Sequence, residues 1–352
     1  FRLARHLGLP AFSIENVPLG EDEMMLMSWG QPAINVNMAA VAEAWERNAP
    51  HRATPRTRER VDQVRRRFAS PGRGLSLQLA HPRGAEAIRE ELDLDRERPV
   101  LLVLPSFTYE MHYRLEHFVF PDAVAWLEET LLHLAERTDC QVVIRDHPYP
   151  NIDRKKDPLA LGQSPERADR LVAARFPELP PHFRLVSPYN EEINTYDLLD
   201  LCDCLLCYTS TAGLEMALRG KNTLVPTSAH YNGKGFTLSP RSRPEYFAML
   251  DRLITDGETR RLTPRQVELA QCYNEVFYFD LGRPFPWSCG WGISRTLYRR
   301  WPVERVLSLE GFLRPFSPVF DEIADPRWRP DPEKERRAVA AYLEAIGERS
   351  RR

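Results

Sequence analysis

The chain has 352 residues, 43% of them hydrophobic and 28% charged, and its 48 Lys and Arg residues nearly balance its 50 Asp and Glu residues. The length allows two domains with substantial cores, and the balanced charge excludes the basic excess that marks nucleic-acid-binding domains. The sequence contains no apolar run of about 18 residues, so we expect no transmembrane segment.

The N-terminal residues indicate a chain that starts inside a larger sequence. Residues 1–15 have the pattern of a helix end that runs into a short buried strand, and they lack the charged and apolar regions of a signal peptide. We therefore expect the sequence to be cut from a longer protein. The strand, predicted over 10–14, ends at Glu15, and a carboxylate at a strand end is well placed to face a cleft. For a single residue of this kind, a loop acid or a helix cap is the commoner role.

The rest of the first domain, predicted over 1–96, is mostly helical. Residues 17–30 are acidic and Met-rich and are expected to form a loop, whereas 39–48 and 57–69 have helical spacing, the latter with a solvated basic face. Residues 89–98 are charged and turn-like, which predicts a domain boundary just before residue 97.

Residues 97–282 are predicted to form the second domain, in which strands and helices alternate. Continuous apolar runs are typical of strands that are buried on both faces. The predicted strands are 100–104, 140–144, 183–186, 201–208 and 222–226, and the helices between them are 122–136, 167–176, 193–201 and 214–219. This order predicts a Rossmann-type α/β domain with a parallel, doubly wound sheet. Helices over 245–254 and 263–279 follow, and 283–352 are predicted to be a helical extension.

A turn of small residues, Thr209-Ser210-Thr211-Ala212-Gly213, follows the fourth predicted strand and opens a helix. Free backbone N–H groups and hydroxyls at the carboxyl end of a parallel strand favour an anion, so a phosphate or diphosphate is the expected ligand. Ser and Thr also cap helices without binding a ligand, and for an isolated turn that role is the commoner one.

Other polar residues are expected at the same edge of the sheet. His147 follows the second strand, and Pro148 holds it on an extended turn. A lone loop histidine is more often structural, but beside a phosphate it can donate a hydrogen bond or a charge. Tyr231 and Lys234 lie in the loop after the fifth strand. Glu215, in the first helical turn, suits the hydroxyls of a ribose or sugar, and compensation of the helix dipole explains it equally well.

The cysteines do not form a metal-binding pattern. Strand alternation sends Cys202 and Cys204 to one face and Cys207 to the other, and no Cys/His pair completes a zinc motif. We interpret these residues as small buried hydrophobes in a reducing compartment, and we predict no metal site and no cofactor.

Three of these elements together resemble a known family. His147-Pro148, the stretch STAGLEMALRGK from Ser210 and the stretch HYNGKGFT from His230 are similar to motifs of the bacterial capsule polysaccharide biosynthesis family, which includes Kdo transferases. The resemblance covers residues 99 to about 279 well and the first forty weakly. It implies a GT-B fold of two facing Rossmann-like domains, of which residues 1–96 would supply a partial, truncated N-terminal α/β domain on the acceptor side.

The resemblance also implies roles for individual residues. His147, Ser210 and Thr211 would hold the donor phosphate, with Ala212, Gly213, Glu215, Tyr231 and Lys234 nearby. At the acidic E-D-G motif of the family this chain has Glu15-Asn16-Val17, so Glu15 is the implied catalytic carboxylate. A Pro105-Ser106 pair stands where the family has a Gln-Pro turn.

The predicted activity is metal-independent glycosyl transfer from a nucleotide sugar, with CMP-Kdo as one candidate, to a surface polysaccharide or glycolipid. The expected location is the cytoplasm, with peripheral association at the inner face of the inner membrane left open. Two alternatives remain. One is a GT-B-like sugar-nucleotide epimerase or polyol-phosphate polymerase, and the other is a non-catalytic donor-binding module in a polysaccharide assembly complex.

Overall fold

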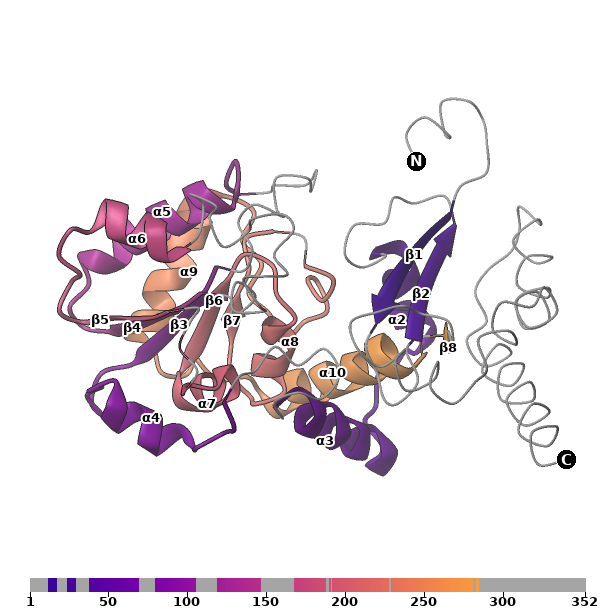
Figure 1. Ribbon diagram of the computed structural model, residues 1–352. Coiled ribbons are helices and arrows are strands. Elements are labelled where there is room, and N and C mark those ends of the chain that lie inside the picture. The colour runs from indigo at the N-terminus through magenta and orange to yellow at the C-terminus, as the bar shows by residue number, and fades with distance from the viewer. Residues whose placement is uncertain are drawn as a thin grey trace, which may run out of the picture. The chain divides into compact units, whose positions relative to one another are not determined.

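The computed structural model, drawn in Figure 1, contains two compact units. The first comprises residues 1–50 and 274–352, and the second comprises residues 51–273. The residues that the structure describes are 12–17, 24–29, 38–69, 80–105, 119–146, 168–187, 190, 192–227, 229–280 and 283–284.

The second unit is built on a five-stranded parallel sheet in the order β5-β4-β3-β6-β7. The strands are β3 (Val100–Leu104), β4 (Gln141–Arg145), β5 (Phe183–Val186), β6 (Cys204–Cys207) and β7 (Thr223–Leu224). Every residue of β3, β4 and β6 is buried, as expected for strands covered on both faces. The predicted Rossmann-type, parallel, doubly wound sheet is confirmed.

Helices cover both faces of this sheet (Figure 1). One face carries α5 (Ala123–Ala135), α6 (Ala168–Arg175) and α9 (Arg243–Thr255). The other carries α4 (Ala85–Glu91), α7 (Thr195–Leu201) and α8 (Ala212–Ala217). Two more helices are α3 (Pro55–Ala69) and α10 (Pro264–Glu275), the latter reaching the end of this unit. No helix in the described part of the chain is long and apolar enough to cross a membrane.

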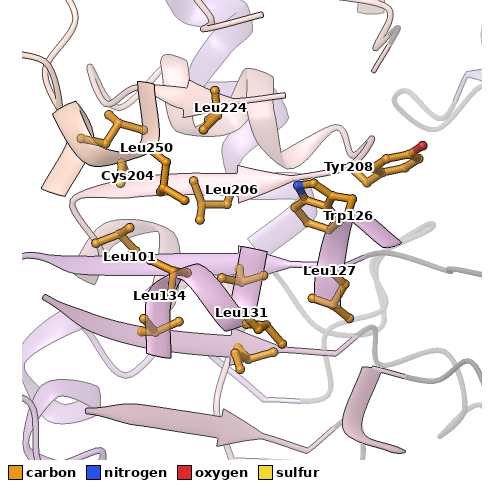
Figure 2. Close-up of a cluster of buried hydrophobic side chains, with 14 of the residues drawn as sticks. Leu101, Trp126, Leu127, Leu131, Leu134, Cys204, Leu206, Tyr208, Leu224 and Leu250 are labelled. Carbon is orange, nitrogen blue, oxygen red and sulfur yellow. The ribbon is translucent and has the colours of Figure 1, made fainter. Parts of the chain in front are cut away.

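The main core lies between the sheet and the α5 face. Figure 2 shows leucines of α5 packing toward Leu101 of β3 and Leu206 of β6. Trp126 donates a hydrogen bond from Nε1 to the hydroxyl of Tyr246 in α9 over 2.8 Å, so even the polar atoms of this core are paired. This packing fixes the carboxyl ends of the strands relative to one another.

The strand order reverses between β3 and β6. From β3 the chain moves outward through β4 to β5, then crosses to β6 and continues to β7 on the other side. Loops that leave two such strands diverge and open a crevice at their carboxyl ends, which is where open α/β sheets bind ligands. The turn after β6 therefore lies at the switch point of the sheet.

A helix that was not predicted lies before the predicted boundary at residue 97. Residues 85–91 form the helix α4, whose last three residues fall in the stretch 89–98 that was expected to be turn-like, and they belong to the second unit. The carboxylate of Asp197 in α7 accepts hydrogen bonds from the backbone N–H groups of Arg83 and Gly84, over 2.8 and 3.0 Å. These bonds attach α4 to the Rossmann-type domain.

The described part of the first unit contains a three-stranded antiparallel sheet, β1-β2-β8. Its strands are β1 (Phe12–Val17), β2 (Met24–Trp29) and β8 (Arg283–Pro284). The helix α2 (Met38–Arg47) and the π-helical turn η5 (Val276–Asp280) contribute buried side chains.

Two expectations for this region are wrong. The acidic, Met-rich residues are not all loop, because β2 pairs with β1. The first strand does not end at Glu15 but continues to Val17, and Glu15 lies opposite Leu26 within the ladder. A strand continues as long as its partner supplies hydrogen bonds, and the sequence of β1 alone does not contain that partner.

Candidate functional site

The site is built around the turn from Tyr208 to Thr211, between β6 and α8. Ser210 Oγ accepts a hydrogen bond from the N–H of Ala212 over 3.2 Å, and the Ser210 carbonyl accepts one from the N–H of Gly213 over 3.2 Å. Thr211 is exposed and Ser210 is half-buried. The turn therefore presents two hydroxyl groups at the switch point of the sheet, which is chemistry suited to an anion.

Gly213 is required by close packing beneath the turn. A Cβ atom at this position would lie 2.1 Å from the hydroxyl oxygen of Tyr231 and 2.5 Å from Cζ. The Tyr231 hydroxyl donates to the carbonyl of Ser210 over 2.7 Å. Tyr231 has no exposed surface, so in this structure it contacts the turn from the protein interior.

Glu215 points into a buried polar cluster of α3, α7 and α8. Only 7% of its surface is exposed, and its carboxyl group is hydrogen-bonded to Tyr196. Burial raises the pKa of Glu215, while the nearby charges of Arg219 and Arg65 act in the opposite direction. The Arg65 guanidinium also donates to the carbonyl of Leu218 over 2.6 Å, which ties α3 to the end of α8.

His147 lies outside the described residues, but the strand that leads to it is described. Arg145, the last residue of β4, is 3% exposed and donates to the carbonyls of Ser187 and Asn190, the latter over 3.4 Å. Burial lowers the pKa of Arg145 to about 10, so the side chain stays charged at neutral pH. Since β4 and β6 both flank β3, the chain leading to His147 and the turn at Ser210 leave neighbouring positions of one sheet edge.

Lys234 lies in the same loop as Tyr231, between Gly233 and Gly235, which both have positive φ angles. It is half-buried. Burial lowers the pKa of His51, and the charges of Arg265 and Lys234 lower it further. Of the two loop residues, Tyr231 is the one that contacts the turn.

The described cysteines are all buried, and none of them forms a disulfide. Burial raises the pKa values of Cys140 and Cys207 to about 12, so these thiols are protonated at neutral pH. Among the described residues, no group of three or more His, Cys, Asp or Glu side chains could hold a metal ion.

The comparisons with known proteins identify the family. Residues 57–246, more than half of the chain, match the family described as capsule polysaccharide biosynthesis protein. The chain belongs to this family. The matched region includes most of α3, the whole parallel sheet and the turn after β6, and it confirms the family that the sequence motifs indicated. A search of curated proteins found no match to this chain.

Several solved structures are similar to this chain. A KpsC β-Kdo 2,4 transferase from Thermosulfurimonas dismutans is 18% identical with a TM-score of 0.39, and the match covers 77% of this chain and 74% of that one. The β-Kdo 2,7 transferase of the same KpsC is 12% identical with a TM-score of 0.38, covering 79% and 72%. Sucrose-phosphate synthase from Thermosynechococcus elongatus is 13% identical with a TM-score of 0.34, and this chain spans 45% of its length.

Sequence reasoning placed the turn directly after the fourth strand, as the structure has it, but gave no role to Arg145, which is buried at the end of β4. The signal was present, because a charged residue at the end of a continuous apolar strand must find partners at the sheet edge. No local sequence pattern indicated that the side chains of Tyr231 and Glu215 point inward, because their direction depends on which helices pack beneath the turn.

Proposed function

We propose that this chain is a glycosyltransferase that moves a sugar from a nucleotide donor to a polysaccharide or glycolipid acceptor. The observation that carries the proposal is the turn after β6. It presents the Ser210 and Thr211 hydroxyls at the switch point of a Rossmann-type sheet, in a family of capsule polysaccharide biosynthesis proteins. A phosphate of the donor is the anion that such a turn suits.

The proposed reaction places the developing charge at this turn. The bond between the anomeric carbon and the phosphate oxygen breaks, and its electron pair leaves on that oxygen. Hydroxyl and N–H donors around Ser210, together with His147, stabilise the leaving phosphate. The oxygen of the acceptor hydroxyl bonds to the anomeric carbon, and its proton passes to a carboxylate. Glu15 is our candidate for this group, acting as the base or alternatively as a nucleophile.

The other predicted donor residues have different roles in this proposal. Ala212 contributes its N–H to the turn, and Gly213 allows Tyr231 to approach. Glu215 is buried, so we assign it to holding α8 against α7 instead of contacting a ribose. Lys234 supplies positive charge in the loop after β7. A donor of the CMP-Kdo type remains one candidate.

Nucleotide binding tests the proposal. Isothermal titration with CMP, UDP and GDP should identify a nucleotide that binds the wild-type chain. Ser210→Ala and His147→Ala should each weaken that binding roughly tenfold, because a hydrogen bond to a charged group contributes about 1.5 kcal/mol or more. Ser242→Ala is a matched control, since Ser242 caps α9 by accepting a hydrogen bond from the N–H of Glu245. Unchanged affinity in both site variants would contradict the assignment.

Product analysis separates transfer from the alternatives. Glu15→Gln should bind nucleotide normally but release no nucleoside phosphate in the presence of acceptor. An isomerised donor in the absence of acceptor would instead indicate an epimerase. Nucleotide binding by the wild type without turnover on any acceptor preparation would favour a non-catalytic module.

A further inference from the structure

Two buried hydroxyl groups from the segment after β7 hold the turn after β6. The Thr227 hydroxyl donates to the carbonyl of Tyr208 over 2.5 Å, and the Tyr231 hydroxyl donates to the carbonyl of Ser210 over 2.7 Å. Thr227 is 5% exposed and Tyr231 is 0% exposed. The loop therefore holds two carbonyl oxygens of the turn, both on the protein side.

Holding a carbonyl inward also determines where the next N–H points. A trans peptide is planar, and its C=O and N–H bonds point in opposite directions. Because the Ser210 carbonyl faces Tyr231, the N–H of Thr211 is directed away from Tyr231. Thr211 is itself an exposed residue of the turn. The two buried hydroxyls thus orient backbone N–H groups of the turn that they do not contact.

Tyr231 is itself fixed by the residues around it. The ring of His230 packs against Tyr231 edge to face, with centroids 4.8 Å apart. The Tyr273 hydroxyl of α10 donates to the carbonyl of His230 over 2.7 Å, and His230 Nδ1 lies 2.9 Å from the same hydroxyl oxygen. Since the single proton of that hydroxyl is used, Nδ1 is the donor in the second bond. Burial raises the pKa of Tyr231, so its hydroxyl remains a donor across the neutral range.

We propose that Tyr231 and Thr227 are positioning residues that preorganise the turn for a phosphate group of the donor. The inference rests on the proposed function. It assigns Tyr231 to holding the turn from the protein interior instead of contacting the donor directly. A turn held in its binding conformation does not have to be ordered when the ligand arrives, which increases affinity without a new contact. Loss of either hydroxyl removes a hydrogen bond that orients a carbonyl of the turn, and at Ser210 only the bond from the N–H of Gly213 would remain. The N–H that follows each carbonyl is then held less firmly in its direction.

Conservative variants of the full chain test this inference. Tyr231→Phe and Thr227→Val remove one hydroxyl each, and Thr227→Ser restores it. The probe is CMP, UDP or GDP, whichever binds the wild type, titrated by calorimetry. We expect the dissociation constant to rise about three- to tenfold in Tyr231→Phe and in Thr227→Val, and to return toward the wild-type value in Thr227→Ser.

Tyr246→Phe is the matched control for a general loss of stability. Tyr246 is also fully buried, and its hydroxyl bonds to Trp126 and Thr130 over 2.8 Å each, in the core on the α5 face. It should lower the thermal midpoint as Tyr231→Phe does and leave the dissociation constant unchanged. Equal nucleotide affinity in wild type, Tyr231→Phe and Thr227→Val would overturn the inference alone. No nucleotide binding by the wild type would refute the proposed function and this inference with it.

Discussion

Asp197 provides a direct test of how the second unit is held together. Its carboxylate is 2% exposed and accepts hydrogen bonds from the N–H groups of Arg83 and Gly84 at the start of α4. Gly84 is the N-cap residue of α4, with φ 93° and no side chain to cap the helix. A carboxylate from a helix more than one hundred residues away therefore serves as the cap.

The expected cost follows from these two bonds. Asp197→Ala leaves two backbone N–H groups without a protein partner, and each buried unpaired donor costs about 1–3 kcal/mol. Because α4 is short and water can reach its start, we expect a total of about 2–4 kcal/mol for local opening of α4. Asp197→Asn keeps one acceptor oxygen and should cost about half as much. Asp200→Ala, on the same helix, removes a carboxylate that is 54% exposed and should cost less than about 1 kcal/mol.

Native-state hydrogen exchange measures this cost where it arises. In Asp197→Ala the protected amides of α4 should exchange about 30- to 1000-fold faster, corresponding to the 2–4 kcal/mol above, while amides of β3 and β4 change less. Asp200→Ala should leave α4 near the wild-type rates. If α4 exchanged in Asp197→Ala as it does in the wild type, the capping argument would be wrong and α4 would be held by its apolar contacts alone.

Three further predictions concern buried groups. Burial raises the pKa of Glu215, so its contribution to stability is full below the unfolded pKa of about 4.3 and is lost as pH rises through the folded pKa; the thermal midpoint of the wild type relative to Glu215→Gln should therefore fall as the pH rises above about 4. Lys221 Nζ donates to the carbonyls of Leu199, Asp200 and Cys202 at the end of α7. In urea titrations Lys221→Met should therefore lower the free energy of unfolding by about 2 kcal/mol, and Lys221→Arg should recover part of this loss. The described cysteines are buried, so in a Cys289→Ser variant Ellman's reagent should label no thiol of the folded chain at pH 8. After denaturation it should label the remaining cysteines. Rapid labelling of the folded variant would contradict their burial.

The parts of the fold that the sequence predicted well are those set by local pattern. The strands 100–104 and 183–186 match β3 and β5, and the helices around 122–136 and 245–254 differ from α5 and α9 by one or two residues at each end. Buried parallel strands are continuous apolar runs, and amphipathic helices repeat with their own period, so both are visible without any partner.

The parts that were missed depend on partners far away in the sequence. The helix α4 ends within the stretch 89–98 that was expected to be turn-like, and the carboxylate that holds its start comes from Asp197. Strand β2 was read as loop because its hydrogen bonds come from β1 and β8. In each case the stabilising group is absent from the local window, which is the reason that a local pattern could not reveal the element.

The short motif of the candidate site also contains both kinds of residue, those whose role follows from the local sequence and those whose role depends on distant partners. Ser210 and Thr211 have exposed surface and can reach a ligand, whereas Gly213 and Glu215 face the interior and contact Tyr231 and Tyr196. Neighbouring residues of one binding motif can thus be required for different reasons. The first pair suits the chemistry of an anion, and the second pair is required by the packing beneath the turn. Substituting the first pair should change binding more than stability, and substituting the second pair should change both, since a turn that is no longer held cannot present its donors.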